Sequence, residues 1–217
     1  MSARGLFITM EGGEGVGKST NMALLERYLH GNNVDVIVTR EPGGTQLGEE
    51  VRELLLKERK GSVSDMAELL LMFAARAQHI EEVIEPALAS GTWVLCDRFT
   101  DATYAYQSGG RGMPSDSVRT LEDLVQKTLR PDCTILLDAD VETGMTRAQE
   151  RGELDRIEQE AVAFFERVRT RYLQIAARSS GRCRVIDASQ SMENVEQQLL
   201  ALGEELLSCW SVRQPEK

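Results

Sequence analysis

The sequence has few of the residues that metal-binding and disulfide-stabilised proteins require. It holds four cysteines and two histidines among 217 residues, and the cysteines lie far apart. Neither a disulfide framework nor a Cys/His zinc site is therefore expected. No apolar run approaches the roughly 18 residues of a membrane span, and the run at 6–10 is too short for a secretory signal. We therefore expect a cytoplasmic protein without a membrane partner.

Basic residues are outnumbered as well. The chain has 25 lysines and arginines against 35 aspartates and glutamates, a formal net charge of −10. Binding to a nucleic-acid polymer or an anionic membrane needs an extended basic face, so both partners are disfavoured, although a small basic pocket is not excluded. Hydrophobic residues make up 41% and charged residues 28%, as in ordinary globular proteins. The length predicts one domain spanning residues 1–217.

Short apolar runs alternate with longer segments of helical periodicity, which is typical of parallel strands joined by helices. Strands are predicted at five apolar runs, namely 6–10, 34–39, 93–96, 133–138 and 183–187. Helices are predicted at about 18–30, 46–57, 65–89, 115–129, 141–151, 158–178 and 192–209. The pattern indicates an α/β fold with a parallel sheet. The charged stretch 147–157 is interpreted as a mobile surface segment.

The most specific motif directly follows the first predicted strand. Residues 12–19 read GGEGVGKS, which matches G-x-x-x-x-G-K-[ST] and leads into a helix. The glycines let backbone N–H groups surround a phosphate, and the helix dipole adds positive charge. Lys18 is expected to reach the β- and γ-phosphates of a nucleotide, and Ser19 to bind Mg²⁺. A glycine-rich turn without a ligand is the weaker alternative.

The phosphate loop alone does not identify the second substrate. No N-K-x-D segment is present, so a guanine-reading GTPase is disfavoured, but a motor or an ATP-binding module stays open. Three further segments follow in order, TREPGGT at 39–45, DRF at 97–99 and RGELDR at 151–156. With the phosphate loop they resemble the bacterial thymidylate kinases, nucleoside monophosphate kinases that convert dTMP to dTDP.

This resemblance covers nearly the whole chain and implies several structural properties. It implies the three-layer P-loop NTPase fold, with a five-stranded parallel sheet flanked by helices and a small helical lid at about 147–157. It also implies ATP as phosphoryl donor, Mg²⁺ as cofactor and a homodimer. The alternatives are a kinase for another nucleotide or deoxynucleoside, which is the nearer rival, and a non-catalytic P-loop module.

The resemblance also implies the residues of the donor side. The residues implied for ATP are Gly12, Gly13, Gly15, Val16, Gly17, Lys18, Ser19, Thr20 and Arg147. Asp97 ends the third predicted strand, at the sheet edge where such folds bind ligands, and is expected to hold Mg²⁺ together with Ser19. Catalytic roles are implied for Lys18, Asp97, Arg98 and Arg151. A surface ion pair between Asp97 and Arg98 is the structural alternative.

The dTMP side is implied by residues from four segments. They are Glu14, Glu41, Pro42, Arg52, Met72, Phe73, Arg76, Arg98, Thr103, Tyr106 and Gln107. Arg76 is expected at a carbonyl of the base, and Tyr106 beside the sugar. The family's base-stacking aromatic would fall at Met72, so either Met72 or the adjacent Phe73 contacts the base. Gly15 after the loop acid resembles the subgroup whose catalytic arginine comes from the lid, where Arg147, Arg151 and Arg156 stand.

Overall fold

The computed structural model describes residues 4–57, 61, 63–151 and 155–212. Its centre is a parallel sheet of five strands in the order β2-β3-β1-β4-β5. The strands are β1 (Phe7–Gly12), β2 (Val36–Arg40), β3 (Trp93–Asp97), β4 (Cys133–Asp138) and β5 (Cys183–Asp187). The predicted α/β fold and all five predicted strands are confirmed, with boundaries that differ by at most two residues.

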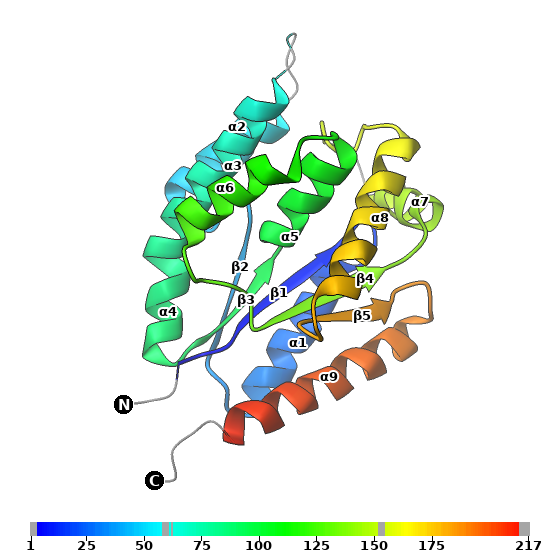
Figure 1. Ribbon diagram of the computed structural model, residues 1–217. Coiled ribbons are helices and arrows are strands. Elements are labelled where there is room, and N and C mark those ends of the chain that lie inside the picture. The colour runs from blue at the N-terminus through cyan, green and yellow to red at the C-terminus, as the bar shows by residue number, and fades with distance from the viewer. Residues whose placement is uncertain (1–3, 58–60, 62, 152–154, 213–217) are drawn as a thin grey trace.

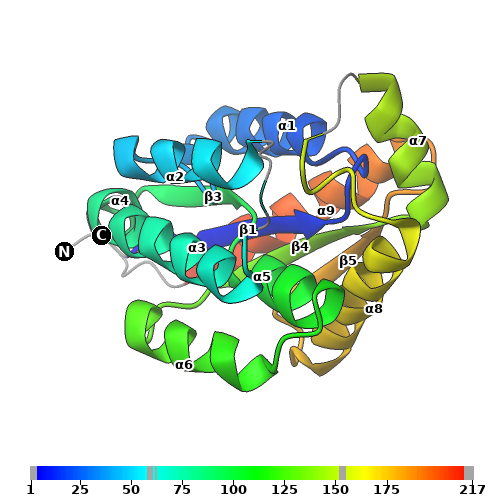
Figure 2. The ribbon, with the colours of Figure 1, turned by 90° about the horizontal axis from the view of Figure 1, so that it is seen from above.

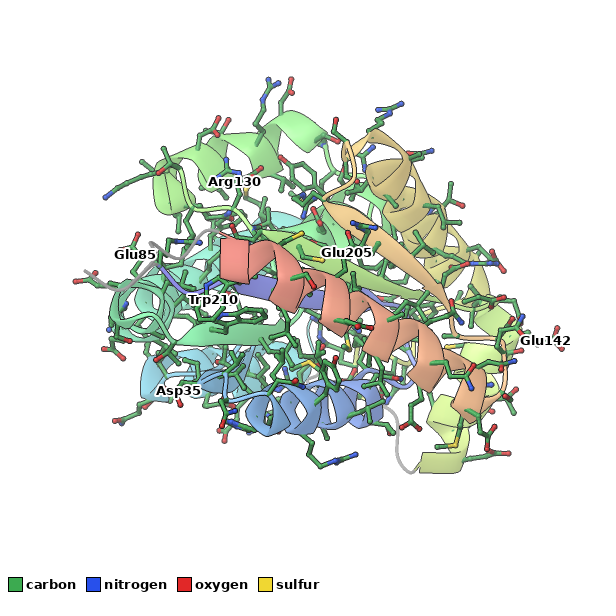
Figure 3. The ribbon with its side chains drawn as sticks, turned by 90° about the horizontal axis from the view of Figure 1, so that it is seen from below. Asp35, Glu85, Arg130, Glu142, Glu205 and Trp210 are labelled. Atoms are coloured by element: carbon green, nitrogen blue, oxygen red, sulfur yellow. The ribbon has the colours of Figure 1, made fainter. Side chains whose placement is uncertain are left out.

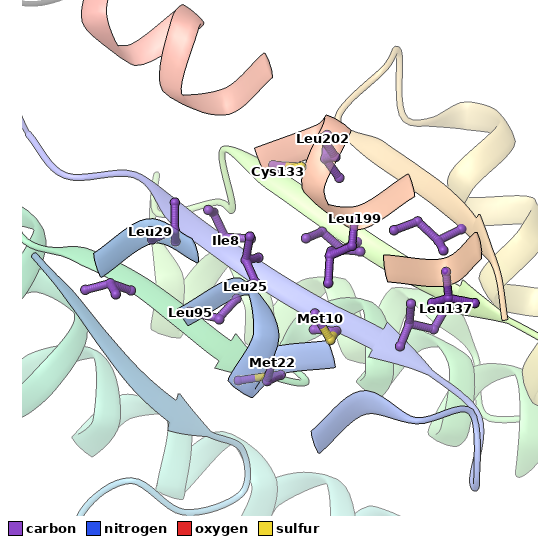
Figure 4. Packing of buried hydrophobic residues seen from close by; sticks show 14 of the residues in the cluster. Ile8, Met10, Met22, Leu25, Leu29, Leu95, Cys133, Leu137, Leu199 and Leu202 are labelled. Carbon is purple, nitrogen blue, oxygen red and sulfur yellow. The ribbon is translucent and has the colours of Figure 1, made fainter. Parts of the chain in front are cut away.

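Helices cover both faces of the sheet and make three layers (Figure 1). Alternate side chains of the strands, among them Ile8 and Met10, pack against α1 (Lys18–Gly31) and α9 (Met192–Val212) (Figure 4). Figure 3 shows α9 lying across this face, with Trp210 near its end. The ring of Trp210 meets the buried Trp93 edge to face, at a centroid distance of 5.4 Å.

The opposite face is covered by the helical segments at 80–90 and 162–178. Phe7 of β1 packs with Ile84 and Leu88, and Leu136 of β4 packs with Val168 of α8 (Val162–Arg178). In Figure 2, α6 (Ser115–Gln126) lies outside α3 (Asp65–His79) and α5 (Thr100–Thr103), further from the sheet. No helix in the described part of the chain is both long enough and apolar enough to span a bilayer.

The predicted helix 65–89 is one continuous rod with a local widening. It consists of α3 (Asp65–His79), the π-helical turn η1 (Ile80–Ile84) and α4 (Glu85–Ser90). Pro86 has no N–H to donate, and its ring would crowd the carbonyl group of Glu82 in a regular α-helix. The wider turn of η1 directly before it accommodates that ring.

A helical segment at residues 100–110 was not predicted from the sequence. It consists of α5 (Thr100–Thr103) and the π-helical turn η2 (Tyr104–Gly110). Threonine, serine and paired glycines all lower helix propensity, so local pattern gave no signal here. Packing of Ala105 and Tyr106 against Phe164 and Phe165 of α8 stabilises the segment instead.

The stretch interpreted as a mobile surface segment is partly ordered helix and partly buried. Its first part, to Arg151, belongs to α7 (Val141–Arg151). Beyond the gap, the Asp155 carboxylate accepts hydrogen bonds from the backbone N–H groups of Ile157 and Glu158, at 2.8 and 2.9 Å. Glu158 is buried. Residues 155–157, the last part of the predicted surface segment, are half-buried, and side-chain capping by Asp155 orders their turn.

Candidate active site

The candidate site lies at the carboxyl edge of the sheet. Residue Met10 of β1 pairs with Asp97 of β3, so the loop after β1 and the loop after β3 emerge side by side. The segment after β2 joins them, because Arg40 also pairs with Asp97. Helix α2 (Gln46–Leu56) begins directly beyond this segment. Parallel strands thus deliver three separate motifs to one place.

A cavity of about 540 Å³ opens between these loops. Most of the predicted site residues line it: Glu14, Gly15, Val16, Gly17, Lys18, Ser19, Thr20, Glu41, Pro42, Arg52, Met72, Arg76, Asp97, Arg98, Thr103, Tyr106, Gln107 and Arg147. Gly12, Gly13 and Phe73 lie outside this lining. The side chain of Arg151 lies outside the residues that the structure describes.

The phosphate loop holds Lys18 at the floor of the cavity. Lys18 is the first residue of α1, so the positive end of the helix dipole faces the cavity. Its Nζ donates to the carbonyl oxygen of Gly13 at 2.8 Å. Burial lowers the pKa of Lys18, and the nearby Arg98 lowers it further, while Glu14 and Asp97 oppose that change. The loop is therefore suited to an anionic ligand.

Arg98 and Glu14 form an ion pair at the centre of the site. The Glu14 Oε1 atom accepts from Arg98 Nη2 at 2.7 Å and from the Tyr106 hydroxyl at 2.6 Å. The guanidinium carbon of Arg98 also lies 4.8 Å from the centre of the Tyr106 ring. Charge pairing, hydrogen bonding and ring contact together hold these three side chains in one arrangement.

Glu11 is a site residue that the sequence reasoning missed. Its carboxylate is fully buried and accepts from the backbone N–H of Phe99 and from the Tyr172 hydroxyl, both at 2.8 Å. The first contact holds the chain next to Arg98, whose φ of 66° is unfavourable for a residue with a side chain. Burial, reinforced by Asp101, raises the pKa of Glu11 to about 7. Its one sequence signal is an acidic residue ending an apolar strand.

The far end of the cavity holds polar atoms whose hydrogen-bonding capacity is only partly used. Arg76 donates from Nε to Glu41 Oε2 at 2.6 Å and from Nη2 to Thr103 Oγ1 at 3.0 Å. Its Nη1 is buried and meets no hydrogen-bond partner in the described part of the chain, and the same holds for Oε1 of Gln107. Buried polar atoms usually have partners. This donor and this acceptor therefore indicate a ligand with the complementary groups.

Glu41 supports Arg76 from behind. Its second oxygen lies 3.0 Å from Nδ1 of His79, whose Nε2 lies 2.7 Å from the Thr39 hydroxyl. Both carboxylate oxygens are engaged in this way, so Glu41 fixes the orientation of the arginine. Glu41 also lines the cavity, and its predicted contact with a substrate stays a prediction.

Phe73 and Met72 occupy different surroundings. The Phe73 side chain is 2% exposed and packs with Leu69 and Val118 behind the cavity wall. Its ring centre lies 4.7 Å from the guanidinium carbon of Arg76. Met72 lines the cavity itself. Of the two candidates, the thioether side chain is the one that faces the cavity.

Three predicted arginines are anchored at the rim. Arg52 Nη1 donates to the carbonyl oxygen of Pro42 at 3.1 Å, and Arg147 Nη1 to that of Ala188 at 3.1 Å. Arg156 Nε donates to the carbonyl oxygen of Leu55 at 2.8 Å. Arg52 and Arg147 line the cavity. Arg156 instead connects the turn at 155–158 to the end of α2.

The phosphate loop touches α7 through two glycines. A Cβ atom on Gly15 would lie 1.9 Å from the carbonyl oxygen of Gly144, and one on Gly144 would lie 2.4 Å from that of Glu14. Only residues without a Cβ permit this approach. Helix α7 therefore rests directly on the backbone of the loop.

The comparisons with known proteins agree with one another. The family model described as thymidylate kinase matches residues 10–199. A thymidylate kinase of Pseudomonas putida (strain GB-1) is 58% identical over 198 residues, which cover 91% of this chain and 94% of that one. A thymidylate kinase of Alcanivorax borkumensis is 55% identical over 202 residues, covering 93% and 97%. The crystal structure of thymidylate kinase from Ehrlichia chaffeensis superposes with a TM-score of 0.74 at 35% identity, covering 92% and 98%.

The glycine contact predicts a large effect of a single methyl group. Gly144→Ala would place Cβ 2.4 Å from a backbone oxygen, so α7 must move away from the loop. Denaturant titration should show a loss of about 1–3 kcal/mol in the free energy of unfolding. Gly31→Ala is the matched control, because Gly31 is also helical and no atom lies within 4 Å of its added Cβ. Equal stability of the two variants would contradict the close contact.

Glu11 predicts a pH dependence of stability. Its pKa is about 7 in the folded chain against an ordinary value of 4.5, so the folded state binds the proton more tightly than the unfolded state. Stability contributed by this group is therefore lost as the pH rises from about 4.5 to about 7, by up to about 3 kcal/mol. The free energy of unfolding of the wild type should fall relative to Glu11→Gln across that window. Parallel pH profiles would contradict the assignment.

Proposed function

This chain belongs to the thymidylate kinase family, and we propose which of its residues carry the reaction. The chain transfers the γ-phosphoryl group of ATP to dTMP, giving dTDP and ADP. The observation that carries the assignment of roles is the pairing of a phosphate loop at one end of the cavity with the buried unpaired atoms of Arg76 and Gln107 at the other. One cavity thereby accommodates phosphates and a base.

The donor nucleotide binds at the phosphate loop. Backbone N–H groups of residues 12–19 and the start of α1 hold the phosphates, and Lys18 exchanges its bonds to loop carbonyl oxygens for the β- and γ-phosphates. Arg147 at the rim contacts the adenine. Lid arginine Arg151 completes the charge stabilisation in this proposal.

Mg²⁺ fits the residues beside the loop. The Oδ1 atom of Asp97 is buried without a hydrogen-bond partner in the described part of the chain, and Ser19 lines the same cavity. No cluster of three or more acidic, histidine or cysteine side chains that suits a metal occurs among the described residues. One carboxylate and one hydroxyl suit Mg²⁺, which keeps several waters and takes its other ligands from phosphates. The ion would neutralise charge on the transferred group.

The acceptor phosphate lies between Arg98 and Arg52. Both side chains line the cavity, and Arg98 is already oriented by Glu14 and Tyr106. An oxygen of the dTMP phosphate attacks the γ-phosphorus while the bond to the bridging oxygen of ADP breaks. The attacking oxygen is already ionised, so no general base is needed. Catalysis is achieved by positioning and by neutralisation of charge.

The thymine lies at the far end of the cavity. Arg76 Nη1 donates to a carbonyl oxygen of the base, Gln107 Oε1 accepts from its N–H, and the Met72 side chain covers its face. Thr103 lines the same wall and holds Arg76. Tyr106 and Glu14 lie between base and phosphates, where they contact the deoxyribose.

An acceptor panel tests this proposal. ADP production should be fast with dTMP and dependent on it, and slow with dCMP, dGMP, AMP or thymidine, because each of these lacks either the pyrimidine imide edge or the acceptor phosphate. ATP turnover that needs no acceptor, or none with dTMP, would contradict the proposal. Lys18→Ala and Arg98→Ala should each lower kcat by about 10³-fold with dTMP.

A surface arginine is the control for these variants. Arg119 of α6 pairs with Asp116, and its side chain is 65% exposed, away from the cavity lining. Arg119→Ala should retain wild-type turnover. If Arg98→Ala behaved like Arg119→Ala, Arg98 would have no catalytic role.

The proposal includes a homodimer in the cytoplasm. Met66 and Leu70 stand one turn apart on α3 and are 47% and 50% exposed, so they form an apolar stripe that a second copy would cover. The four cysteines are free thiols, which is typical of a reducing compartment.

Size-exclusion chromatography with light scattering tests the dimer. The wild type should elute at about twice the chain mass at micromolar concentration, and Leu70→Glu should shift the equilibrium toward monomer because it buries a charge in the interface. Leu124→Glu on α6, 70% exposed, is the matched control away from α3. A wild-type monomer would contradict the proposal.

A further inference from the structure

Glu68 is a buried carboxylate that no role described so far explains. It lies in the first turn of α3 and is 1% exposed. Its Oε1 accepts from Gln107 Nε2 at 3.0 Å and from Arg111 Nε at 3.1 Å. Its Oε2 accepts from Arg156 Nη2 at 2.5 Å. One carboxylate thus joins α3, the helical segment at 104–111 and the turn at 155–158.

The protonation state of Glu68 determines how Gln107 is turned. Burial alone would raise the pKa of this carboxyl, but the hydrogen bonds from Arg156 and Arg111 outweigh burial and hold the pKa below its ordinary value. The ionised carboxylate has no proton to donate. It therefore accepts the NH₂ group of Gln107 and repels the amide oxygen, so Oε1 must point to the other side of the amide.

The side chain of Gln107 forms part of the cavity wall. Its Oε1 is buried with no hydrogen-bond partner among residues 4–57, 61, 63–151 and 155–212. An amide left free to rotate by half a turn would present either oxygen or NH₂ there. Glu68 removes that choice and leaves only an acceptor.

A second fixed contact lies two helical turns away on α3 and four residues away on the segment 100–110. Arg76 and Glu68 stand two turns apart on α3 with Met72 between them, and their partners Thr103 and Gln107 stand four residues apart. The cavity therefore presents the donor Arg76 Nη1 and the acceptor Gln107 Oε1 on either side of Met72. Each of these side chains is fixed by a buried hydrogen bond from another of its nitrogen atoms, Nη2 of Arg76 to Thr103 and Nε2 of Gln107 to Glu68.

This donor and acceptor match one class of pyrimidine edge. Thymine and uracil present a carbonyl oxygen beside an N–H, which is an acceptor beside a donor. Cytosine presents an amino group beside an unprotonated ring nitrogen, the reverse order, so each contact would meet a group of its own kind. Buried polar groups left unpaired in this way can reject an analogue strongly.

We propose that Glu68 is a specificity-determining positioning residue, which fixes the Gln107 amide with its oxygen toward the base so that the site accepts an imide edge and rejects cytosine. The inference rests on the proposed binding of the base by Arg76 and Gln107. Glu68 itself does not touch the base in this arrangement. It acts through an amide that could otherwise satisfy either edge.

The test compares dUMP with dCMP, because both lack the 5-methyl group and differ at the edge in question. The measured quantity is the kcat/KM for dUMP divided by the kcat/KM for dCMP. Glu68→Gln should lower this ratio by about 10- to 100-fold, because a glutamine at 68 accepts either orientation of Gln107. Gln107→Met, which keeps the length of the side chain but has no amide, should lower it at least as much. The double variant should match Gln107→Met alone.

Three results would overturn the inference. A wild-type ratio in Glu68→Gln while Gln107→Met falls would refute only the role of Glu68. A wild-type ratio in Gln107→Met would refute the proposed base contact together with it. Equal losses of kcat/KM for both nucleotides, additive in the double variant, would show that Glu68 only supports the fold.

Two further variants make the test robust. Glu68→Asp keeps the charge for both arginines but withdraws the carboxylate from Gln107, so it should also lower the ratio even if Glu68→Gln does not fold. A wild-type ratio in a folded Glu68→Asp protein would count against the inference. Glu122→Gln is the control, since Glu122 is a largely buried acid that pairs with Arg130 at 2.7 Å outside the cavity lining. It should keep the wild-type ratio.

Discussion

Parallel hydrogen bonding of β1 to β3, with Met10 opposite Asp97, brings the two halves of the site together. The phosphate loop continues from one strand and the Asp97–Arg98 pair ends the other, so their separation follows from the strand register. Arg98 then bonds to the carbonyl oxygen of Gly12 at 3.0 Å and to Glu14, which ties the two loops across the sheet edge. The position of each remaining site residue is set relative to this junction, because α1 starts from the loop and α5 starts behind Arg98.

Buried acids determine how the arginines of the site are held. Glu14 orients Arg98, and Glu41 orients Arg76. Transfer of a charged group out of water is costly unless it is paired, so each pair is retained in a single geometry. A cavity that must bind two polyanionic nucleotides therefore has its cations positioned before either ligand arrives. The net charge of −10 therefore says little about ligand binding, which depends on the few cations gathered in the cavity.

The predicted parts of the fold are those with a strong local signal. Strands such as Trp93–Asp97 are continuous apolar runs, and the loop GGEGVGKS is recognised from its own residues. The segment 100–110 was missed because its helix depends on packing against α8 rather than on its composition. The burial of Glu158 was missed for a related reason, since only the Asp155 side chain and the surrounding fold order that turn.

The sequence by itself determined the fold class, the phosphate loop and the set of candidate residues, because each is encoded by neighbours along the chain. It could not decide between Met72 and Phe73, which are adjacent and both apolar; the rotation of α3 places the first in the cavity and the second behind Arg76. It gave no sign that Glu68 matters, and for Glu11 it gave only an acidic residue at the end of an apolar strand. Their partners stand 39 and 88 residues away, and only the tertiary fold brings those groups within hydrogen-bond distance.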